Sequence, residues 1–404
     1  MLYDYYKGNT AITKRVLQDA SKPNNKVMNA YSSYIVDTYT GYFLGEPVNY
    51  TANENQELLE RITELFNYND ESAINAELAK DASIFGCAYE LMYMDADANI
   101  RFKKIDATKI IPIYDNTLEE ELLYCIRYYD EEDIENGNKT TYIEVYGREW
   151  IRFYENKTSM KFVGEREHAF KAVPINIYHN NEELMGDFEN VISLIDAYDA
   201  ITSDSINEFN YFSDCYLALY GMSGTEPEDI AAMKEQRVLL LETDAKAEWL
   251  TKQINDTYVE NLKNRLDAQI HKFSRCPALT DENFAANASG VAMKYKLMGI
   301  ETATSKKERA FKKALQRRIE LICNIFSVMG TDYDYRDIQM TFKRNIPSNL
   351  VEVADVVSKV GHLLSEETQI SMLPLDLDAK AELEKREAAT AIDYTFEEEE
   401  VTNE

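Results

Sequence analysis

The histidines, serines and glycines of this sequence are the first places to look for catalytic chemistry, and their spacing matches no catalytic motif. A G-x-x-x-x-G-K-[ST] loop, which cradles ATP phosphates in P-loop enzymes, does not occur. His179-Asn-Asn-Glu-Glu only approaches the H-E-x-x-H pattern of zinc hydrolases, and Ala288-Ser289-Gly290 lacks the G-x-S-x-G nucleophile elbow. The other histidines are dispersed: His168, His271 and His362. We therefore expect no catalytic residue, no metal ligands and no cofactor.

Carboxylates are numerous enough to leave one enzymatic alternative open. The sequence has 72 Asp and Glu residues against 43 Lys and Arg residues, a formal net charge of −29 at pH 7. Paired carboxylates hold divalent metals in many hydrolases, but no pair stands out from this acidic background. A solvated acidic surface is the simpler interpretation. A metal-dependent acidic hydrolase is the alternative, and cleavage of DNA in the presence of Mg²⁺ or Mn²⁺ would support it.

One segment reverses this charge. Between Lys294 and Arg318 there are nine Lys and Arg residues and two Glu residues, a net charge of +7. Such a run is either a solvated helix face neutralised by acidic neighbours, including copies of the same chain, or a contact surface for a polyanion. Composition favours the first interpretation. The candidate polyanion or intersubunit contacts are Lys306, Lys307, Lys312, Lys313, Arg317 and Arg318.

Length and charge narrow the functional classes further. A chain of 404 residues is long enough for roughly two or three structural units. Its hydrophobic fraction of 45% is sufficient for a sizeable core. The net charge of −29 repels a phosphate backbone, which argues against a conventional DNA-grasping domain. It does not argue against a protein that DNA merely passes.

Cysteine usage indicates a reducing compartment. The cysteines are odd in number and none forms a C-x-x-C pair, so a disulfide framework is not expected. We expect each of them to be a small buried apolar residue. No apolar run reaches the roughly 20 residues that span a bilayer, and the N-terminus does not resemble a signal peptide. The five cysteines are Cys87, Cys125, Cys215, Cys276 and Cys323.

The elements that would position these residues begin with an α+β region over 1–180. Apolar residues at helical spacing predict two helices within 54–94. From 99 to 173 the composition changes to β-branched and aromatic residues, which predicts short strands. Segments 142–146 and 150–154 have the alternation of a hairpin.

Long helices dominate the rest of the chain. Apolar stripes predict one helix over 188–212 and another over 256–275, which Pro277 ends. A short α/β insert separates them, so the pair would form a stalk with a tip. A third helix is predicted over 291–329, followed by a strand at 338–343, further helix and an acidic tail. The predicted fold class is therefore α+β and mainly helical.

A set of short stretches, spread in order over nearly the whole chain, carries a family resemblance. They are Tyr5-Tyr6-Lys7-Gly8, Lys22-Pro-Asn-Asn-Lys26, Tyr34-Ile-Val-Asp-Thr38, Gly41-Tyr-Phe-Leu-Gly45-Glu-Pro47, Phe85-Gly-Cys-Ala-Tyr-Glu-Leu91, Ile113-Tyr-Asp-Asn116, Asn180-Asn181, Gly186-Asp-Phe-Glu189, Leu194-Ile-Asp-Ala-Tyr198, Asp281-Glu-Asn-Phe284, Ser289-Gly-Val-Ala-Met-Lys-Tyr-Lys296 and Phe342-Lys-Arg-Asn-Ile-Pro347. Each is weak alone, and the ordered set is specific. Together they resemble the portal proteins of tailed bacteriophages, in particular long-tailed phages of Gram-positive hosts.

The resemblance implies a portal fold assembled as a ring, usually dodecameric, with wing, stem, clip and crown regions. Members of the family usually carry further residues before the Tyr5 motif and a longer crown. The implied layout is an α+β wing at 1–187, stem helices at 188–214 and 256–275, a clip at 215–255, a tunnel loop at 276–290, a long helix returning to the wing at 291–331, and a crown with an acidic tail at 332–404.

In function, the resemblance implies the head–tail connector at one capsid vertex, a channel through which double-stranded DNA is packaged and ejected. Its implied partners are copies of itself, the DNA, the large terminase subunit, a head-completion or adaptor protein, and the scaffolding and major capsid proteins, with no membrane. It would be assembled in the host cytoplasm and reside in the virion. Another ring-forming virion connector or adaptor protein is the alternative.

The implied tunnel loop supplies the candidate DNA-channel residues. In a ring, copies of this polar loop would converge on the axis, where acidic and amide groups touch DNA without binding it strongly. Phe284 would anchor the loop against the stem. The candidates are Asp281, Glu282, Asn283, Phe284, Asn287 and Ser289.

The stem helices carry an assembly prediction. Their apolar stripes exceed what one subunit can bury, so neighbouring copies must cover the rest. We expect Ile195→Asp or Leu262→Asp to leave a soluble chain that assembles poorly.

Overall fold

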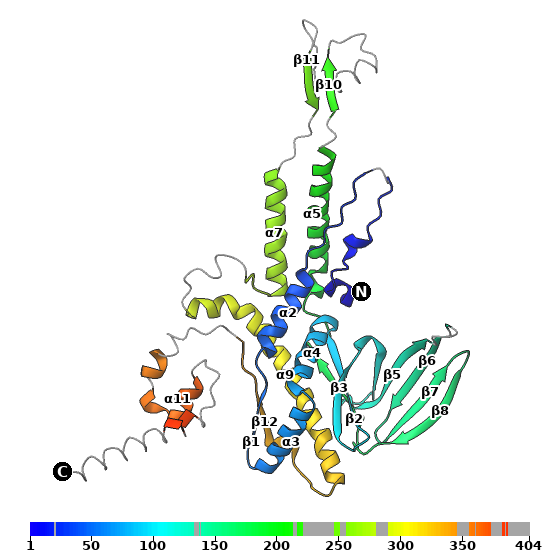
Figure 1. The fold of residues 1–404 in the computed structure, drawn as a ribbon, viewed down its shortest axis with the longest axis vertical. Coiled ribbons are helices and arrows are strands. Elements are labelled where there is room, and N and C mark those ends of the chain that lie inside the picture. The colour runs from blue at the N-terminus through cyan, green and yellow to red at the C-terminus, as the bar shows by residue number, and fades with distance from the viewer. Residues whose placement is uncertain are drawn as a thin grey trace, which may run out of the picture. The chain divides into compact units, whose positions relative to one another are not determined.

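The computed structural model of this chain divides into two units. The first spans Met1–Arg344 and the second Asn345–Glu404. Within the second unit lie the 3-10 helix η5 (Gly361–Leu363) and helix α11 (Glu366–Met372) (Figure 1). The structure describes residues 1–19, 22–132, 137, 139–212, 216–220, 246–250, 256–279, 290–345, 355–359, 361–372, 382–383 and 385–386.

Helices packed on a small sheet form the main core of the first unit (Figure 1). The largest buried cluster joins Leu58 and Ile62 to Phe311 and Leu315, all fully buried. The helices that meet there are α2 (Tyr31–Leu44), α3 (Gln56–Tyr68), α4 (Glu71–Phe85) and α9 (Gly290–Val328). The chain is thus a mixture of helix and sheet, as expected.

Helices α3 and α4 begin and end where their local chemistry requires. The Asn55 side chain caps α3 by accepting a hydrogen bond from the Leu58 backbone N–H at 2.9 Å. Helix α4 ends at Gly86, which has φ of 82°. A Cβ at this position would lie 1.9 Å from the Leu184 carbonyl oxygen, so both the backbone angle and the packing require glycine.

A three-stranded antiparallel sheet lies against these helices, in the order β3-β2-β9. Its strands are β2 (Cys87–Met94), β3 (Ile100–Ile105) and β9 (Ile175–His179). The sequence prediction was wrong here in two places, because 87–94 was assigned to helix and β9 was not predicted. Both faces of β2 are largely covered, so its sequence lacks the alternation of polar and apolar residues that reveals a strand.

A second sheet forms a five-stranded antiparallel meander, in the order β4-β5-β6-β7-β8 (Figure 1). The predicted hairpin is confirmed, with Tyr146 opposite Ile151. These two residues and Cys125 are buried on one face of the sheet. The strands are β4 (Ile110–Tyr114), β5 (Leu122–Glu132), β6 (Lys139–Tyr146), β7 (Trp150–Asn156) and β8 (Met160–Glu167).

The long helices are confirmed close to their predicted bounds. Helices α5 (Ile192–Phe212) and α7 (Asp256–Ser274) lie side by side (Figure 1). Between them in sequence, β10 (Tyr216–Tyr220) pairs antiparallel with β11 (Lys246–Leu250). The rest of the predicted insert lies outside the described residues.

A strand pair ties the end of the first unit to its beginning. Strand β1 (Asn49–Ala52) pairs antiparallel with β12 (Ile338–Thr341). Ile338 and Met340 are buried in the main core, so 332–344 pack with the first unit. The expected boundary at 332 therefore differs from the structural one, because a strand that returns to a distant partner leaves no mark in the local sequence.

Candidate functional site: the helix pair, the N-terminal strap and helix α9

The α5–α7 pair is a helical hairpin with a buried seam. The 21 residues of α5 span about 31 Å. Ile195 of α5 and Ile270 of α7 are both fully buried, in one cluster with residues of α2 and α9. Ile195 therefore packs inside its own chain, and the expectation that Ile195→Asp would impair only assembly is corrected: the substitution places a charge in the core of the subunit.

Other apolar side chains of the pair point outward. Phe209 is 76% exposed and Ile206 is 38% exposed, whereas Leu262 is half-buried. Ile206 and Phe209 are three residues apart and so lie together on one face of α5, and grouped exposed apolar side chains are typical of a contact surface. Phe209 is thus the better residue for testing assembly.

Residues 1–19 and 22–29, which we call the N-terminal strap, are bound along α5. They include α1 (Leu2–Tyr6) and the 3-10 helix η1 (Ala11–Lys14). Fully buried Asp199 accepts hydrogen bonds from Thr10 Oγ1 at 2.6 Å and from the Asn29 backbone N–H and Nδ2, both at 2.8 Å. Tyr5 donates to Asp196 at 2.8 Å, and burial together with this carboxylate raises the pKa of Tyr5 to about 12.

The strap was not predicted from the sequence, although a signal was present. Asp196, Asp199 and Ser203 are three and four residues apart and so share one face of α5. Such a row can hydrogen-bond to a polar partner, but α5 carries other polar residues, including Asp204, Asn207 and Glu208, so the signal is weak. The sequence alone did not identify which segment supplies it.

Tyrosines of α2 hold the start of the predicted tunnel loop. Tyr34 donates to the Pro277 carbonyl at 2.8 Å and accepts from the Leu279 N–H at 2.9 Å, and Tyr39 donates to the Ser274 carbonyl at 2.9 Å. The loop therefore leaves the helix pair from a well-anchored point. The candidate channel residues themselves lie outside the described residues: Asp281, Glu282, Asn283, Phe284, Asn287 and Ser289.

Cysteine burial agrees with the sequence prediction where it can be compared. Cys125, Cys276 and Cys323 are buried, and Cys87 is half-buried. Burial raises the pKa of Cys125, Cys276 and Cys323 to about 12, which keeps these thiols protonated and unreactive near neutral pH. Cys215 lies outside the described residues.

The basic run of α9 separates into buried and exposed members, and Arg318 is the most deeply buried. Its side chain is fully buried and donates to Glu90 at 2.6 Å, to Glu71 at 3.0 Å and to Asn75 at 2.9 Å. Burial alone would lower the pKa of the guanidinium, but the charges of Glu90 and Glu71 help raise it well above its ordinary value. Arg318 was a candidate for a polyanion or an intersubunit contact, and it can make neither, since its side chain is fully buried and its donors are used inside the core.

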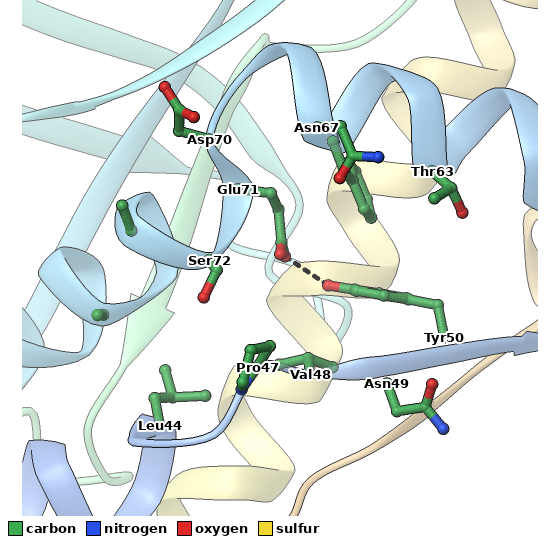
Figure 2. Close-up of a pocket in the computed structure, with 13 residues that line it drawn as sticks. Leu44, Pro47, Val48, Asn49, Tyr50, Thr63, Asn67, Asp70, Glu71 and Ser72 are labelled. Atoms are coloured by element: carbon green, nitrogen blue, oxygen red, sulfur yellow. Dashed lines mark hydrogen bonds between the residues drawn. The ribbon is translucent and has the colours of Figure 1, made fainter. Parts of the chain in front are cut away.

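A surface cavity of about 810 Å³ lies beside this cluster and shows which member faces outward. Tyr50, Asn67 and Glu71 are among its lining residues, and Arg318 is not. Tyr50 donates to Glu71 at 2.6 Å across the wall of the cavity (Figure 2). An anion entering the cavity would thus meet a carboxylate before it met the guanidinium.

Lys307 is the second buried cation of the run. Its ammonium lies 2.6 Å from Asp187, and only 3% of the lysine side chain is exposed. Asp187 also accepts hydrogen bonds from Ser83 and Asn180. The prediction for Lys307 is wrong for the same reason as that for Arg318. Its side chain is buried and joins α9 to the segment before α5.

The remaining basic candidates lie nearer the surface. Lys306 and Lys313 are exposed, and Lys312 is half-buried. Arg317 is half-buried and pairs with Glu320 at 2.9 Å, one turn along the same helix. Of the six predicted contacts, these four keep an exposed or partly exposed side chain.

Arg344 holds the acidic side of α9 and was not predicted. It donates to Glu301 at 2.9 Å and to Glu308 at 2.6 Å, the two glutamates of the basic run. Although burial opposes ionisation, Arg344 and the Tyr42 hydroxyl lower the pKa of Glu301. The neutralising partner of these acidic residues thus comes from beyond β12.

Metal and membrane sites were sought in the part of the chain that the structure describes. There, no group of three or more His, Cys, Asp or Glu side chains is placed to hold a metal ion. Among the described helices, none is both long and apolar enough to cross a bilayer.

Comparison with known proteins agrees with this architecture. The chain is 26% identical over 391 residues to the portal protein of Bacillus phage SPP1, which covers 92% of this chain and 77% of that one. It is also 26% identical over 388 residues to the portal protein of Clostridium phage phiCD119, covering 88% of this chain and 84% of that one. In fold, it resembles a chain from the neck of an empty GTA particle, computed with C6 symmetry. That match has a TM-score of 0.52 and 12% identity, and covers 86% of this chain and 90% of the other.

The family model for phage portal proteins of the SPP1 Gp6-like type matches residues 1–393. This match covers nearly the whole chain, including the strap, the helix pair and α9. The chain therefore belongs to the SPP1 Gp6-like family of phage portal proteins.

Proposed function

We propose that copies of this chain form a ring at one vertex of the capsid, with the twelve subunits that are usual for portal proteins. Double-stranded DNA would pass through its channel during packaging and ejection. The observation that carries the proposal is the α5–α7 hairpin with outward-facing Phe209 and Ile206, in a chain that belongs to a portal family. Each copy covers part of this surface on its neighbour.

The parts of the ring follow the order of the chain. The two sheets and α2–α4 form the wing, α5 and α7 the stem, the insert between them the clip, and the segment after Pro277 the tunnel loop. Residues after β12 form the crown and the acidic tail. This layout is supported by the long antiparallel helix pair and by its place between wing and insert.

Charge suits a conduit better than a DNA-binding domain. A net charge of −29 disfavours lasting phosphate contacts, which would slow DNA sliding in either direction. At a Debye length of about 8 Å, repulsion from the wall acts only on the nearest DNA surface and keeps the duplex centred. In this proposal the chain has a structural and not a catalytic role. A separate large terminase subunit docks on the clip and hydrolyses ATP.

Further partners belong to the same proposal. A head-completion or adaptor protein would bind the clip once packaging ends, and scaffolding and major capsid proteins would surround the wing. The assembled ring would be a component of the virion.

The mass and symmetry of the purified protein test this function. Native mass spectrometry and negative-stain images should show a ring with a central hole and a narrowed stalk. A stable monomer at micromolar concentration would contradict the proposal. Metal-dependent cleavage of DNA by a clean preparation would favour the hydrolase alternative instead.

A further inference from the structure

A groove follows the outer edge of strand β9, beside the exposed part of the basic run. Its cavity volume is about 320 Å³. Helix α9 forms one wall with Lys313 and Arg317, and the β4–β5 turn forms the other with Glu120 and Glu121. Consecutive residues of β9, from both faces of the strand, line the floor, as expected when a strand presents its edge to a cavity.

This edge of β9 carries backbone groups that face away from β2. The Met92 N–H bonds to the Pro174 carbonyl at 2.8 Å, and the Asn180 N–H bonds to the Gly86 carbonyl at 2.9 Å. In an antiparallel pair, bonding and non-bonding residues alternate, so Ile175, Ile177 and His179 direct their N–H and C=O groups away from β2. Within the described chain, no hydrogen bond reaches those groups.

Backbone groups at this edge that are buried without a hydrogen-bond partner destabilise the fold. Ile175 is only 1% exposed, and a buried backbone donor or acceptor is normally paired. The side-chain oxygen of Asn176, a residue that lines the groove and is itself 1% exposed, also lacks a hydrogen-bond partner among the described residues. Ile175 and the Asn176 side chain are closed to a partner by their own chain, whereas Ile177 and His179 are half-buried. The outward backbone groups of Ile177 and His179 are therefore the ones that an added polypeptide strand would satisfy.

The charges on the two walls of the groove determine which charges an added strand should carry on each of its faces. Asn176 and Tyr178 face the α9 side of the sheet, whereas Ile175 packs in the cluster on the β4–β5 side. Side chains of an added strand alternate between these faces. Acidic residues would therefore suit one face, toward Lys313, and a basic residue would suit the other, toward Glu120 and Glu121.

Strand β8 has this pattern, and no other described strand pairs with its outer edge. Among the described strands it pairs with β7 alone, and seven of its eight residues are exposed. Glu165, Arg166 and Glu167 alternate in charge along it. Glu165 pairs with Arg152 in its own chain, but both are more than two-fifths exposed, so this pair is weak and exchangeable.

The topology places the groove and β8 on opposite flanks of the five-stranded sheet. The β4–β5 turn lies at one edge and β8 at the other, four strand spacings or about 19 Å away. Two unlike surfaces on opposite flanks make a head-to-tail contact, which is the kind that closes into rings.

We propose that β8 of a second copy adds to the β9 edge and completes this site. Its Glu167 would lie toward Lys313, and its Arg166 toward the β4–β5 turn. The inference rests on the ring proposed above and adds a specific wing-to-wing contact to it.

Photocross-linking in the assembled protein tests this contact. p-Benzoylphenylalanine replaces His179, and copies labelled with ¹⁴N and ¹⁵N are mixed before assembly. Native mass spectrometry is recorded first. We expect mixed-isotope cross-links between position 179 and residues 160–167. A ring whose position 179 cross-links only elsewhere, or to another polypeptide, overturns the β8 contact and leaves the ring standing. A monomer overturns both.

Two matched pairs of variants in this cross-linking background sharpen the test. Lys313→Glu should abolish the cross-link and Arg309→Glu should preserve it, because Arg309 makes the same charge change on α9 outside the groove. Ile177→Pro removes one outward N–H and should also abolish it, whereas Ile177→Ala keeps that N–H and should preserve it. Equal cross-linking by both members of either pair would contradict strand addition.

Discussion

Arg318 of α9 and Glu90 of β2 form an ion pair at 2.6 Å in which neither side chain is exposed. The pair joins the long helix to the centre of the three-stranded sheet, and Glu71 adds a second carboxylate to the same guanidinium at 3.0 Å. Such a cluster is stable only when complete, because each lost partner leaves a buried charge.

Replacing Arg318 by Ala should therefore lower the free energy of unfolding by about 3–5 kcal/mol. Arg317→Ala is the matched control, since that residue is about a third exposed and its pair with Glu320 contributes about 1 kcal/mol or less. Urea denaturation followed by circular dichroism measures both. Equal stabilities of the two variants would show that the cluster does not hold the core together.

Asp199 should control attachment of the N-terminal strap. Asp199→Ala leaves the donors of Thr10 and Asn29 unpaired and should cost about 1–3 kcal/mol. We expect faster trypsin cleavage at Lys22 and Lys26 in this variant. Asp204→Ala removes a partly exposed pair with Arg15 and should change cleavage much less. Identical cleavage of wild type and Asp199→Ala would argue against the strap.

A substitution at an exposed position of α5 should affect assembly, whereas a substitution at a buried position should affect folding. Phe209→Asp should keep the stability of the monomer within about 0.5 kcal/mol and reduce the ring fraction. Ile195→Asp should instead unfold the subunit, at a cost of about 3 kcal/mol or more. Thermal melts combined with size-exclusion chromatography distinguish these effects. An unchanged ring in Phe209→Asp would remove this face from the interface.

Acid should destabilise the wing through His168. Its Nε2 lies 3.1 Å from the Gly147 carbonyl, its Nδ1 is buried without a partner among the described residues, and burial lowers its pKa below 6.5. The unfolded chain then binds a proton more readily, so stability falls as pH drops below about 6.5. His168→Gln should flatten the stability curve between pH 7 and 5. Parallel curves for the variant and wild type would contradict this assignment.

Reversing the charge of the tunnel loop should slow the passage of DNA through the channel. The double variant Asp281→Lys and Glu282→Lys adds two cations per subunit at the proposed constriction, and phosphate contacts would then retard sliding. Nuclease-protected DNA in a packaging assay measures the effect, with ring mass as the control for assembly. An intact mutant ring that packages at the normal rate and extent would place the loop away from the DNA.

The sequence predicted the long helices because their apolar stripes run for many turns without proline. It missed β2, which is largely covered on both faces and directly follows a helix, and β9, which has only five residues. Which basic residues of α9 point into the core was also predictable in part. Lys307, Phe311, Leu315, Arg318 and Ile322 are spaced by three or four residues and share the apolar face of α9.

A cation in such a row must either be buried with a carboxylate or break the core, and a net count of charge along the segment hides this distinction. The partners could not be predicted, since Glu71 and Glu90 lie more than 200 residues away in sequence. The groove at β9 depended on a strand order that no local pattern contains.

The strap also has a consequence for synthesis on the ribosome. Tyr5 and its partner Asp196 are 191 residues apart. At about 5–20 residues per second, the strap emerges about 10–40 s before α5 does. During that interval Tyr3 and Tyr6 can already contact Phe85 and Asp37, but the strap's hydrogen bonds to Asp196 and Asp199 cannot form, and its free part is open to chaperones and proteases. Slow translation between the strap and α5 would lengthen that exposure, so codon usage across the wing would influence the yield of intact subunits.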